Sequence, residues 1–185
     1  MPTRRPTPEE IRNAAGKTLP DIIAPGLRVL FSGINPGLYS AAVGHHFGRP
    51  GNRFWPALYA AGFTPHLLAP EEGCDLLGWG LGITDIVDRA TTAAAELNAE
   101  ELVAGGRQLA DKVLHFQPRV LAILGISAYR TAYARPKATL GLQPERIGES
   151  LIWILPNPSG LNAHYQPATL AQAFRELRES IPFGD

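Results

Sequence analysis

Cysteine and methionine are almost absent from this 185-residue chain, which holds one of each. The single cysteine, Cys74, excludes an intramolecular disulfide, a cysteine zinc cluster and a four-cysteine iron–sulfur site. The five histidines do not have the HExxH spacing of a zinc enzyme. The sequence therefore predicts neither a metal site nor a cofactor.

The chain also lacks a long apolar run and a net charge. No stretch approaches the roughly 18 apolar residues of a membrane span, and no apolar stretch of a secretory signal follows the basic N-terminal residues. We therefore expect an intracellular, cytoplasmic chain with no membrane contact. The formal net charge is zero, but residues 107–146 hold seven basic and two acidic residues. This distribution fits either a basic face for phosphates or an ordinary solvated surface.

Length and composition indicate one globular domain with a short extension. The proline-rich residues 1–20 are predicted to form a flexible N-terminal arm, with a small helix that starts at Pro8 and has Thr7 as its N-cap. Residues 21–185 are predicted to form a single domain.

Apolar runs and helical periodicity alternate along this domain. Strands are predicted at 28–33, 120–124 and 151–155, and helices at 52–62, 71–77, 98–116, 127–134 and 167–180. Residues 34–51 are predicted as a long loop, and glycines 105 and 106 as a soft spot in their helix. The alternation predicts an α/β fold of three layers, α/β/α, around a short, mainly parallel central sheet.

Two of the predicted strands end in similar motifs. Gly33-Ile-Asn-Pro-Gly-Leu38 follows the first strand, and Pro156-Asn-Pro-Ser-Gly-Leu161 follows the last. Proline ends the hydrogen-bonding ladder and glycine permits a sharp turn. Because ligands of such sheets bind at the carboxyl ends of strands, both loops are expected to open on one site.

The two motifs belong to a longer ordered set, which resembles the mismatch-specific uracil-DNA glycosylase and thymine-DNA glycosylase family of the uracil-DNA glycosylase superfamily. The resemblance spans about residues 22–181 and rests on Gly33–Leu38, Gly44–Phe47, Pro50–Trp55, Gly62-Phe63, Thr84, Val87–Arg89, Gly105–Arg107, Ala122–Gly125 and Asn157–Leu161. It implies a uracil-DNA glycosylase-like fold and an enzyme that flips a base out of DNA and hydrolyses its N-glycosidic bond.

The resemblance also implies roles for residues around the pocket. Asn35 is similar to the residue that positions the attacking water, and Phe47 to the aromatic that stacks on the flipped base. Backbone N–H groups near Ile34 and Phe47 would bind the base edge. Ser40 would lie near the 5-position of the base. Gly37 and Asn157 would also line the base site.

A second group of residues is expected to act on the DNA stack. Leu161 matches the apolar wedge that fills the gap left by the flipped nucleotide. Its neighbours Gly160 and Asn162 would read the widowed guanine, and Ser159 belongs to the same loop.

Two residues depart from the bacterial members of the family. Asp85 stands where they carry lysine, and a carboxylate there could act as a second catalytic group by accepting a proton or stabilising an oxocarbenium-like sugar. The alternative is an aspartate with a structural task. Ala163 replaces an arginine beside the wedge, and His164 or the basic segment 107–146 could compensate.

These features together predict a monofunctional DNA glycosylase that excises uracil from mismatches opposite guanine and so begins base excision repair. Thymine and modified cytosine stay open as further substrates. The expected partner is double-stranded DNA with a mismatched or damaged base, and we expect a monomer that associates with the nucleoid when bound to DNA. Two alternatives are a non-catalytic DNA-binding module of the same fold and a serine hydrolase that uses Ser127, although Tyr129 replaces the second glycine of a nucleophile elbow.

Overall fold

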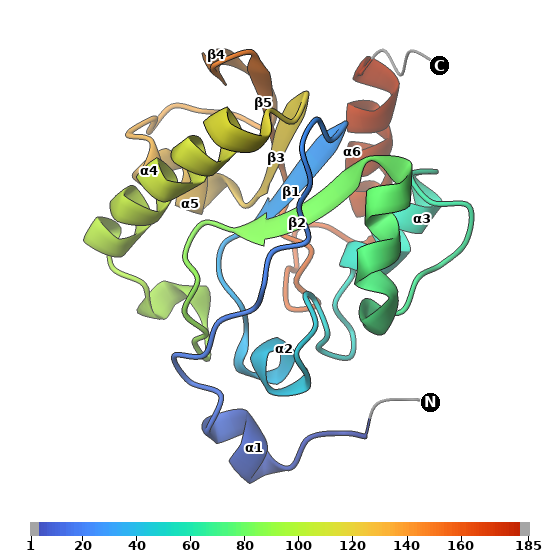
Figure 1. Ribbon diagram of the computed structural model, residues 1–185, viewed down its shortest axis with the longest axis vertical. Helices are drawn as coiled ribbons and strands as arrows, with labels where there is room; N and C mark the ends of the chain where they lie inside the picture. Colours follow the sequence, from blue (N-terminus) through green and yellow to red (C-terminus); the bar gives the residue numbers. More distant parts are fainter. Residues whose placement is uncertain (1–3, 182–185) are drawn as a thin grey trace.

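The computed structural model describes residues 4–181, and five strands of this part of the chain form one sheet (Figure 1). The strands are β1 (Val29–Gly33), β2 (Leu81–Asp85), β3 (Val120–Leu124), β4 (Gly141–Ile147) and β5 (Ser150–Leu155). Their order is β2-β1-β3-β5-β4. The first four in this order run parallel, and β4 pairs antiparallel with β5 at the edge.

Helices cover both faces of the sheet. They are α1 (Pro8–Arg12), α2 (Leu38–Val43), α3 (Phe54–Ala60), α4 (Ala99–Phe116), α5 (Ile126–Ala132), α6 (Pro167–Ser180) and the 3-10 segments η1 (Pro70–Trp79) and η2 (Ala94–Glu96). Figure 1 shows α4 and α5 on one side of the sheet and α3 and α6 on the other. The prediction of a three-layer α/β/α fold with a mainly parallel sheet is confirmed.

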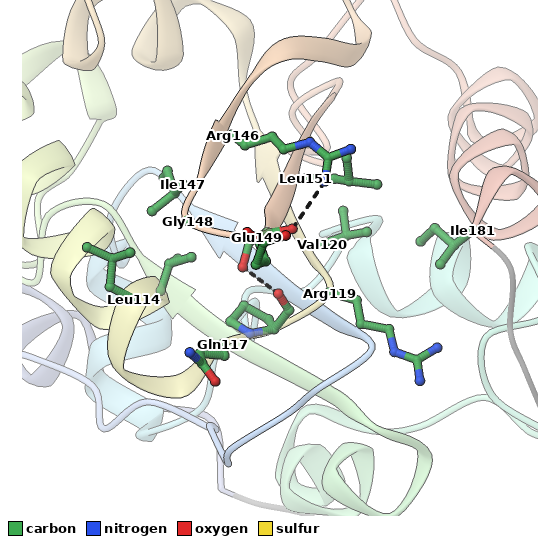
Figure 2. Close-up of a pocket in the computed structure, with 13 residues that line it drawn as sticks. Leu114, Gln117, Arg119, Val120, Arg146, Ile147, Gly148, Glu149, Leu151 and Ile181 are labelled. Atoms are coloured by element: carbon green, nitrogen blue, oxygen red, sulfur yellow. Dashed lines mark hydrogen bonds between the residues drawn. The ribbon is translucent and has the colours of Figure 1, made fainter.

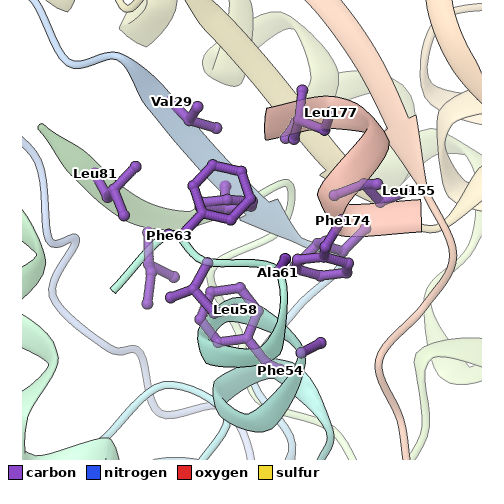
Figure 3. Packing of buried hydrophobic residues seen from close by; sticks show 14 of the residues in the cluster. Val29, Phe54, Leu58, Ala61, Phe63, Leu81, Leu155, Phe174 and Leu177 are labelled. Carbon is purple, nitrogen blue, oxygen red and sulfur yellow. The ribbon is translucent and has the colours of Figure 1, made fainter. Parts of the chain in front are cut away.

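The layer between the sheet and α3 and α6 is an aromatic core (Figure 3). The ring of Phe31 on β1 meets Phe54 edge-on at 5.5 Å and stacks with Phe174 at 6.0 Å. Such pairs contribute about 0.5–1.5 kcal/mol each beyond the area they bury. They fix α3 against β1, and the start of α3 lies next to the carboxyl end of the sheet.

Several elements differ from the sequence prediction. The loop predicted over 34–51 contains α2, a helix of only six residues that ends at Gly44 in the left-handed conformation. The strands β2 and β4 were not predicted, because Gly82 interrupts the apolar run of β2 and β4 is a largely polar edge strand. Gly105 of α4 has a packing task that the sequence did not reveal, since an added Cβ there would overlap the Ile86 carbonyl.

The N-terminal segment packs on α2. Thr7 caps α1 as predicted, and Ala14 is fully buried in a small cluster with Ala41 and Ala90. The amide of Gly16 donates to the Ala90 carbonyl at 2.9 Å. The flexible arm over 1–20 and the single domain over 21–185 stay predictions, and their outermost residues, 1–3 and 182–185, lie outside the described residues. Across residues 4–181, no helix is both long and apolar enough to cross a membrane.

Candidate active site

A cavity of about 260 Å³ lies at the carboxyl ends of the parallel strands. Both Asn-Pro loops line it, as the motifs predicted. The predicted site residues among its walls are Ile34, Asn35, Gly37, Ser40, Phe47, Asp85, Asn157, Ser159 and Leu161. Gly160 lines an adjoining hollow with Gly51, and Asn162 lies behind the loop, where its amide donates to the Asn157 carbonyl.

The side chain of Asn35 is held in one orientation. Its Nδ2 donates to the Arg89 carbonyl at 2.9 Å and to Thr91 Oγ1 at 2.7 Å. Because a carbonyl can only accept, the amide nitrogen must face Arg89. The remaining polar atom, Oδ1, is therefore the acceptor that Asn35 can offer to a water in the cavity.

The backbone around Asn35 is equally constrained. The segment after β2 continues to pair with the segment after β1: Ile86 donates to the Gly33 carbonyl at 3.0 Å and Val87 to the Ile34 carbonyl at 2.9 Å. Further on, Thr91 donates to the Pro36 carbonyl at 3.1 Å. The loop that carries Asn35 is thus an ordered extension of the sheet.

Asp85 is buried at the end of β2 and pairs with His46. The distance from His46 Nδ1 to Asp85 Oδ2 is 3.4 Å, and His46 Nε2 lies 2.9 Å from the Pro20 carbonyl. Asp85 also lies so close to β1 that any side chain at Gly33 would overlap its carboxylate. Only glycine at position 33 leaves room for this carboxylate.

The environment shifts the pKa of both partners. Burial raises the pKa of the Asp85 carboxyl, against the opposing hydrogen bond and charge of His46, and Asp21 and Asp88 add to the rise. Burial acts to lower the pKa of His46, but the hydrogen bond and charge of Asp85, with smaller effects of the Pro20 carbonyl and Asp21, raise that pKa overall. The sequence alone predicted no role for His46, although this residue lies inside the motif Gly44-His-His-Phe47.

Phe47 forms an aromatic wall of the cavity. Its ring stacks on Phe54 with centroids 4.2 Å apart and an interplanar angle of 24°. Its φ of 52° is unusual for a bulky residue and indicates that the surrounding contacts hold it there. Nearby, the buried Ser40 hydroxyl accepts a hydrogen bond from the Gly48 amide at 3.0 Å, which ties α2 to the Phe47 segment.

The loop after β5 presents Leu161, whose exposed fraction of 77% is the highest among the large hydrophobic residues described. Arg53 holds this loop from behind: its guanidinium donates to the carbonyls of Gly160 at 3.2 Å, Asn162 at 3.1 Å and Tyr165 at 2.6 Å. The Arg53 amide also donates to the Pro158 carbonyl at 2.9 Å. Arg53 is a second residue that the sequence analysis left without a role, and it fixes the loop in which Ala163 departs from the family pattern.

A larger cavity, of about 420 Å³, lies at the opposite end of the sheet (Figure 2). Its walls are mainly apolar and include Leu114, Val120, Ile147 and Leu151. Its lining residues include none from the Asn-Pro motifs.

Ser127 is exposed on α5 and does not line the cavity of the motifs. Among residues 4–181, no cluster of three or more His, Cys, Asp or Glu side chains is placed to hold a metal ion.

This arrangement defines a class of protein: an α/β domain whose site lies at the carboxyl edge of a parallel sheet, with an amide acceptor, an aromatic wall and an exposed apolar tip. Residues 20–178 match the family described as the Uracil DNA glycosylase superfamily. The chain therefore belongs to this superfamily, whose members are DNA glycosylases, hydrolases that act on DNA.

A solved structure agrees with the fold. It is the solution NMR structure of a "putative Uracil DNA glycosylase" from Methanosarcina acetivorans, which is 19% identical, with a TM-score of 0.56 over 88% of this chain and 98% of the other. The match over residues 20–178 confirms the predicted superfamily. The narrower assignment to the mismatch-specific and thymine-DNA glycosylases stays a prediction.

Proposed function

We propose that this chain is a monofunctional, mismatch-specific DNA glycosylase that removes uracil opposite guanine in double-stranded DNA. The observation that carries the proposal is the fixed Asn35 amide, whose Oδ1 is the atom left to accept a hydrogen bond from water beside the Phe47 wall. A cavity of about 260 Å³ is smaller than the roughly 300–1,000 Å³ of drug-sized sites, as suits one flipped base.

The reaction needs little general acid catalysis from the enzyme. The bond between the sugar carbon and the base nitrogen breaks with its electron pair on uracil, which leaves as an anion, while the oxygen of water bonds to the sugar carbon. A proton of that water is lost to a base or to solvent. Asn35 would orient the water, and Asp85 would accept its proton or stabilise positive charge on the sugar.

The walls of the site support recognition of a pyrimidine. Phe47 would stack on the flipped base, and the backbone amides near Ile34 and Phe47 would bind its edge. Ser40 is buried beside the Phe47 segment, where it would meet the 5-position and influence the choice between uracil and thymine. Gly37 and Asn157 complete the walls.

Leu161 would enter the DNA stack as the flipped nucleotide leaves it. Its high exposure and the three carbonyls that Arg53 holds support a preorganised wedge. The backbone of Gly160 and Asn162, the neighbours of Leu161, would face the guanine left without a partner, and Ser159 would shape the turn. A single copy of the chain supplies all of these groups, which supports action as a monomer.

The reaction should stop at the abasic site. A bifunctional glycosylase forms a Schiff base through an amine. None of the residues that line the described cavity is a lysine, and Lys112 is paired with Asp21 and Thr84. Borohydride should therefore trap no covalent complex with DNA.

The test is single-turnover base release from duplexes that hold uracil or thymine opposite guanine, with uracil opposite adenine and single-stranded uracil as controls. We expect release of uracil from the mismatch to be fastest. DNA binding without release from any substrate would contradict the proposal and would favour a non-catalytic module.

A further inference from the structure

The hydrogen bond between His46 and Pro20 determines which nitrogen of the imidazole carries hydrogen. The Pro20 carbonyl can only accept, so His46 Nε2, 2.9 Å away, must be the donor. A neutral imidazole with hydrogen on Nε2 has a bare lone pair on Nδ1. That lone pair would then face Asp85 Oδ2 at 3.4 Å.

Two lone pairs cannot face each other in a buried site without a penalty, so one proton must lie between these atoms. We propose that His46 is a positioning residue that shares a single proton with Asp85 and keeps the Asp85 carboxylate charged at the cavity. The proposal rests on the proposed role of Asp85 in base release. His46 itself acts only through Asp85.

The proton is expected to reside on the imidazole. An unperturbed imidazole is a stronger base than an unperturbed carboxylate by about two and a half pKa units. The two side chains are buried almost equally, with 6% and 8% exposed, so burial does not separate them. The Pro20 carbonyl also binds the charged imidazolium more strongly than the neutral ring.

Other charged groups near Asp85 are already compensated or exposed. Asp21, on the segment before β1, forms an ion pair with Lys112 of α4 and accepts a hydrogen bond from Thr84. Asp88, on the segment after β2, is exposed to solvent, which screens its charge. His46 is thus the cation that faces Asp85, and the indole of Trp55 anchors its backbone carbonyl at 3.2 Å.

The direct test is a titration of the histidine side chains by NMR in the free protein, which does not depend on activity. The signal of His46 is assigned by its loss in His46→Gln. We expect His46 to remain an imidazolium to a higher pH than the roughly 6.5 of an unperturbed histidine. In Asp85→Asn the midpoint of the His46 titration should fall by about one pH unit or more, because the hydrogen bond and charge of Asp85 no longer oppose the effect of burial.

Two outcomes would overturn the proposal. One is a wild-type His46 that is neutral at pH 7, with hydrogen on Nε2 only, since the proton would then belong to Asp85. The other is a titration that does not change in Asp85→Asn. Neither result contradicts the proposed glycosylase activity, which is measured separately as base release. The titration therefore tests the shared proton independently of the proposed function.

Two variants of His46 then connect the pair to the reaction. His46→Gln keeps an amide donor for the Pro20 carbonyl but offers none at the position of Nδ1. His46→Asn places an amide donor near the position of Nδ1 and loses the contact with Pro20. If His46 positions the Asp85 charge, His46→Asn should keep more activity than His46→Gln.

The pH profile of single-turnover uracil release separates this role from a merely structural one. In His46→Gln the acidic limb should move up by about one pH unit or more, with about tenfold slower release at a pH on that limb. Combining it with Asp85→Asn should add little further loss. Equal losses in both His46 variants with an unchanged pH profile would contradict the proposal.

Discussion

The two ends of the central sheet each carry a cavity, and the two cavities differ in size and in the residues that line them. The cavity at the amino end is the larger, about 420 Å³ against 260 Å³, and its walls are mainly apolar. Two polar side chains beside it bind backbone carbonyls: Arg146 donates to the Glu149 carbonyl and Ser150 to the Pro118 carbonyl (Figure 2). The smaller cavity at the carboxyl end gathers an oriented amide, a buried carboxylate and an aromatic ring.

The kinds of polar groups present, rather than the cavity volume, are the reason to place the proposed reaction at the carboxyl end of the sheet. The residues that follow parallel strands all lie at the carboxyl edge of the sheet, so a few loops can place several polar groups close together there. Substitutions at the two ends should therefore have unequal effects on base release.

The largest effect is expected for Asn35→Ala. Loss of the acceptor that orients water should slow single-turnover uracil release by about 10²-fold or more, with little change in DNA affinity. Release is measured with labelled duplexes, and Gln108→Ala on the exposed face of α4 is the matched control. An unchanged rate would remove Asn35 from the mechanism.

The next largest effect is expected for Asp85→Asn, about tenfold or more, with folding preserved. In the wild-type enzyme the rate should fall as pH drops through the pKa of Asp85, which burial raises, because only the ionised carboxylate accepts a proton. The double variant with Asn35→Ala should lose less than the two single losses combined, as expected for groups acting on one water. Asp111→Asn, exposed on α4, is the control.

If Asp85→Asn releases uracil at the wild-type rate at every pH, Asn35 acts in base release without Asp85. Asp85 would then have only a structural task at the end of β2.

A smaller and substrate-dependent effect is expected for Leu161→Ala. A stable pair depends on the wedge more than a weak one, so thymine-containing or well-paired duplexes should lose several-fold more than a uracil–guanine mismatch. Leu67→Ala is the control, because it removes another exposed leucine (54% exposed). It should leave the rates on both kinds of duplex unchanged from wild type. Equal losses on both duplexes would indicate that Leu161 only supports its loop.

The smallest effect is expected at the amino end. Leu114 is 52% exposed at the larger cavity, and Leu114→Ser should change stability by no more than about 0.5 kcal/mol. Uracil release should stay within about twofold of wild type. A large loss of activity with an unchanged melting temperature would show that the cavity at the amino end of the sheet also takes part in uracil release.

The sequence predicted the parts of the fold that carry their own signal. β1, β3 and β5 are short runs rich in Val, Leu and Ile, and sheets covered on both faces require such runs. β4 and α2 were missed because a polar edge strand and a six-residue helix leave no clear periodicity. β2 was missed because its glycine admits the Ile22 backbone and breaks the apolar pattern.

The α/β class, the superfamily and the residues of the two Asn-Pro loops can be read from the sequence alone, since local motifs and apolar runs encode these directly. Only the tertiary structure decided that His46 meets Asp85 and the Pro20 carbonyl, and that Arg53 holds the loop of Leu161. These contacts join segments that lie far apart along the chain. They depend on strand register and helix packing, and no local pattern records which distant groups those will bring within hydrogen-bonding distance.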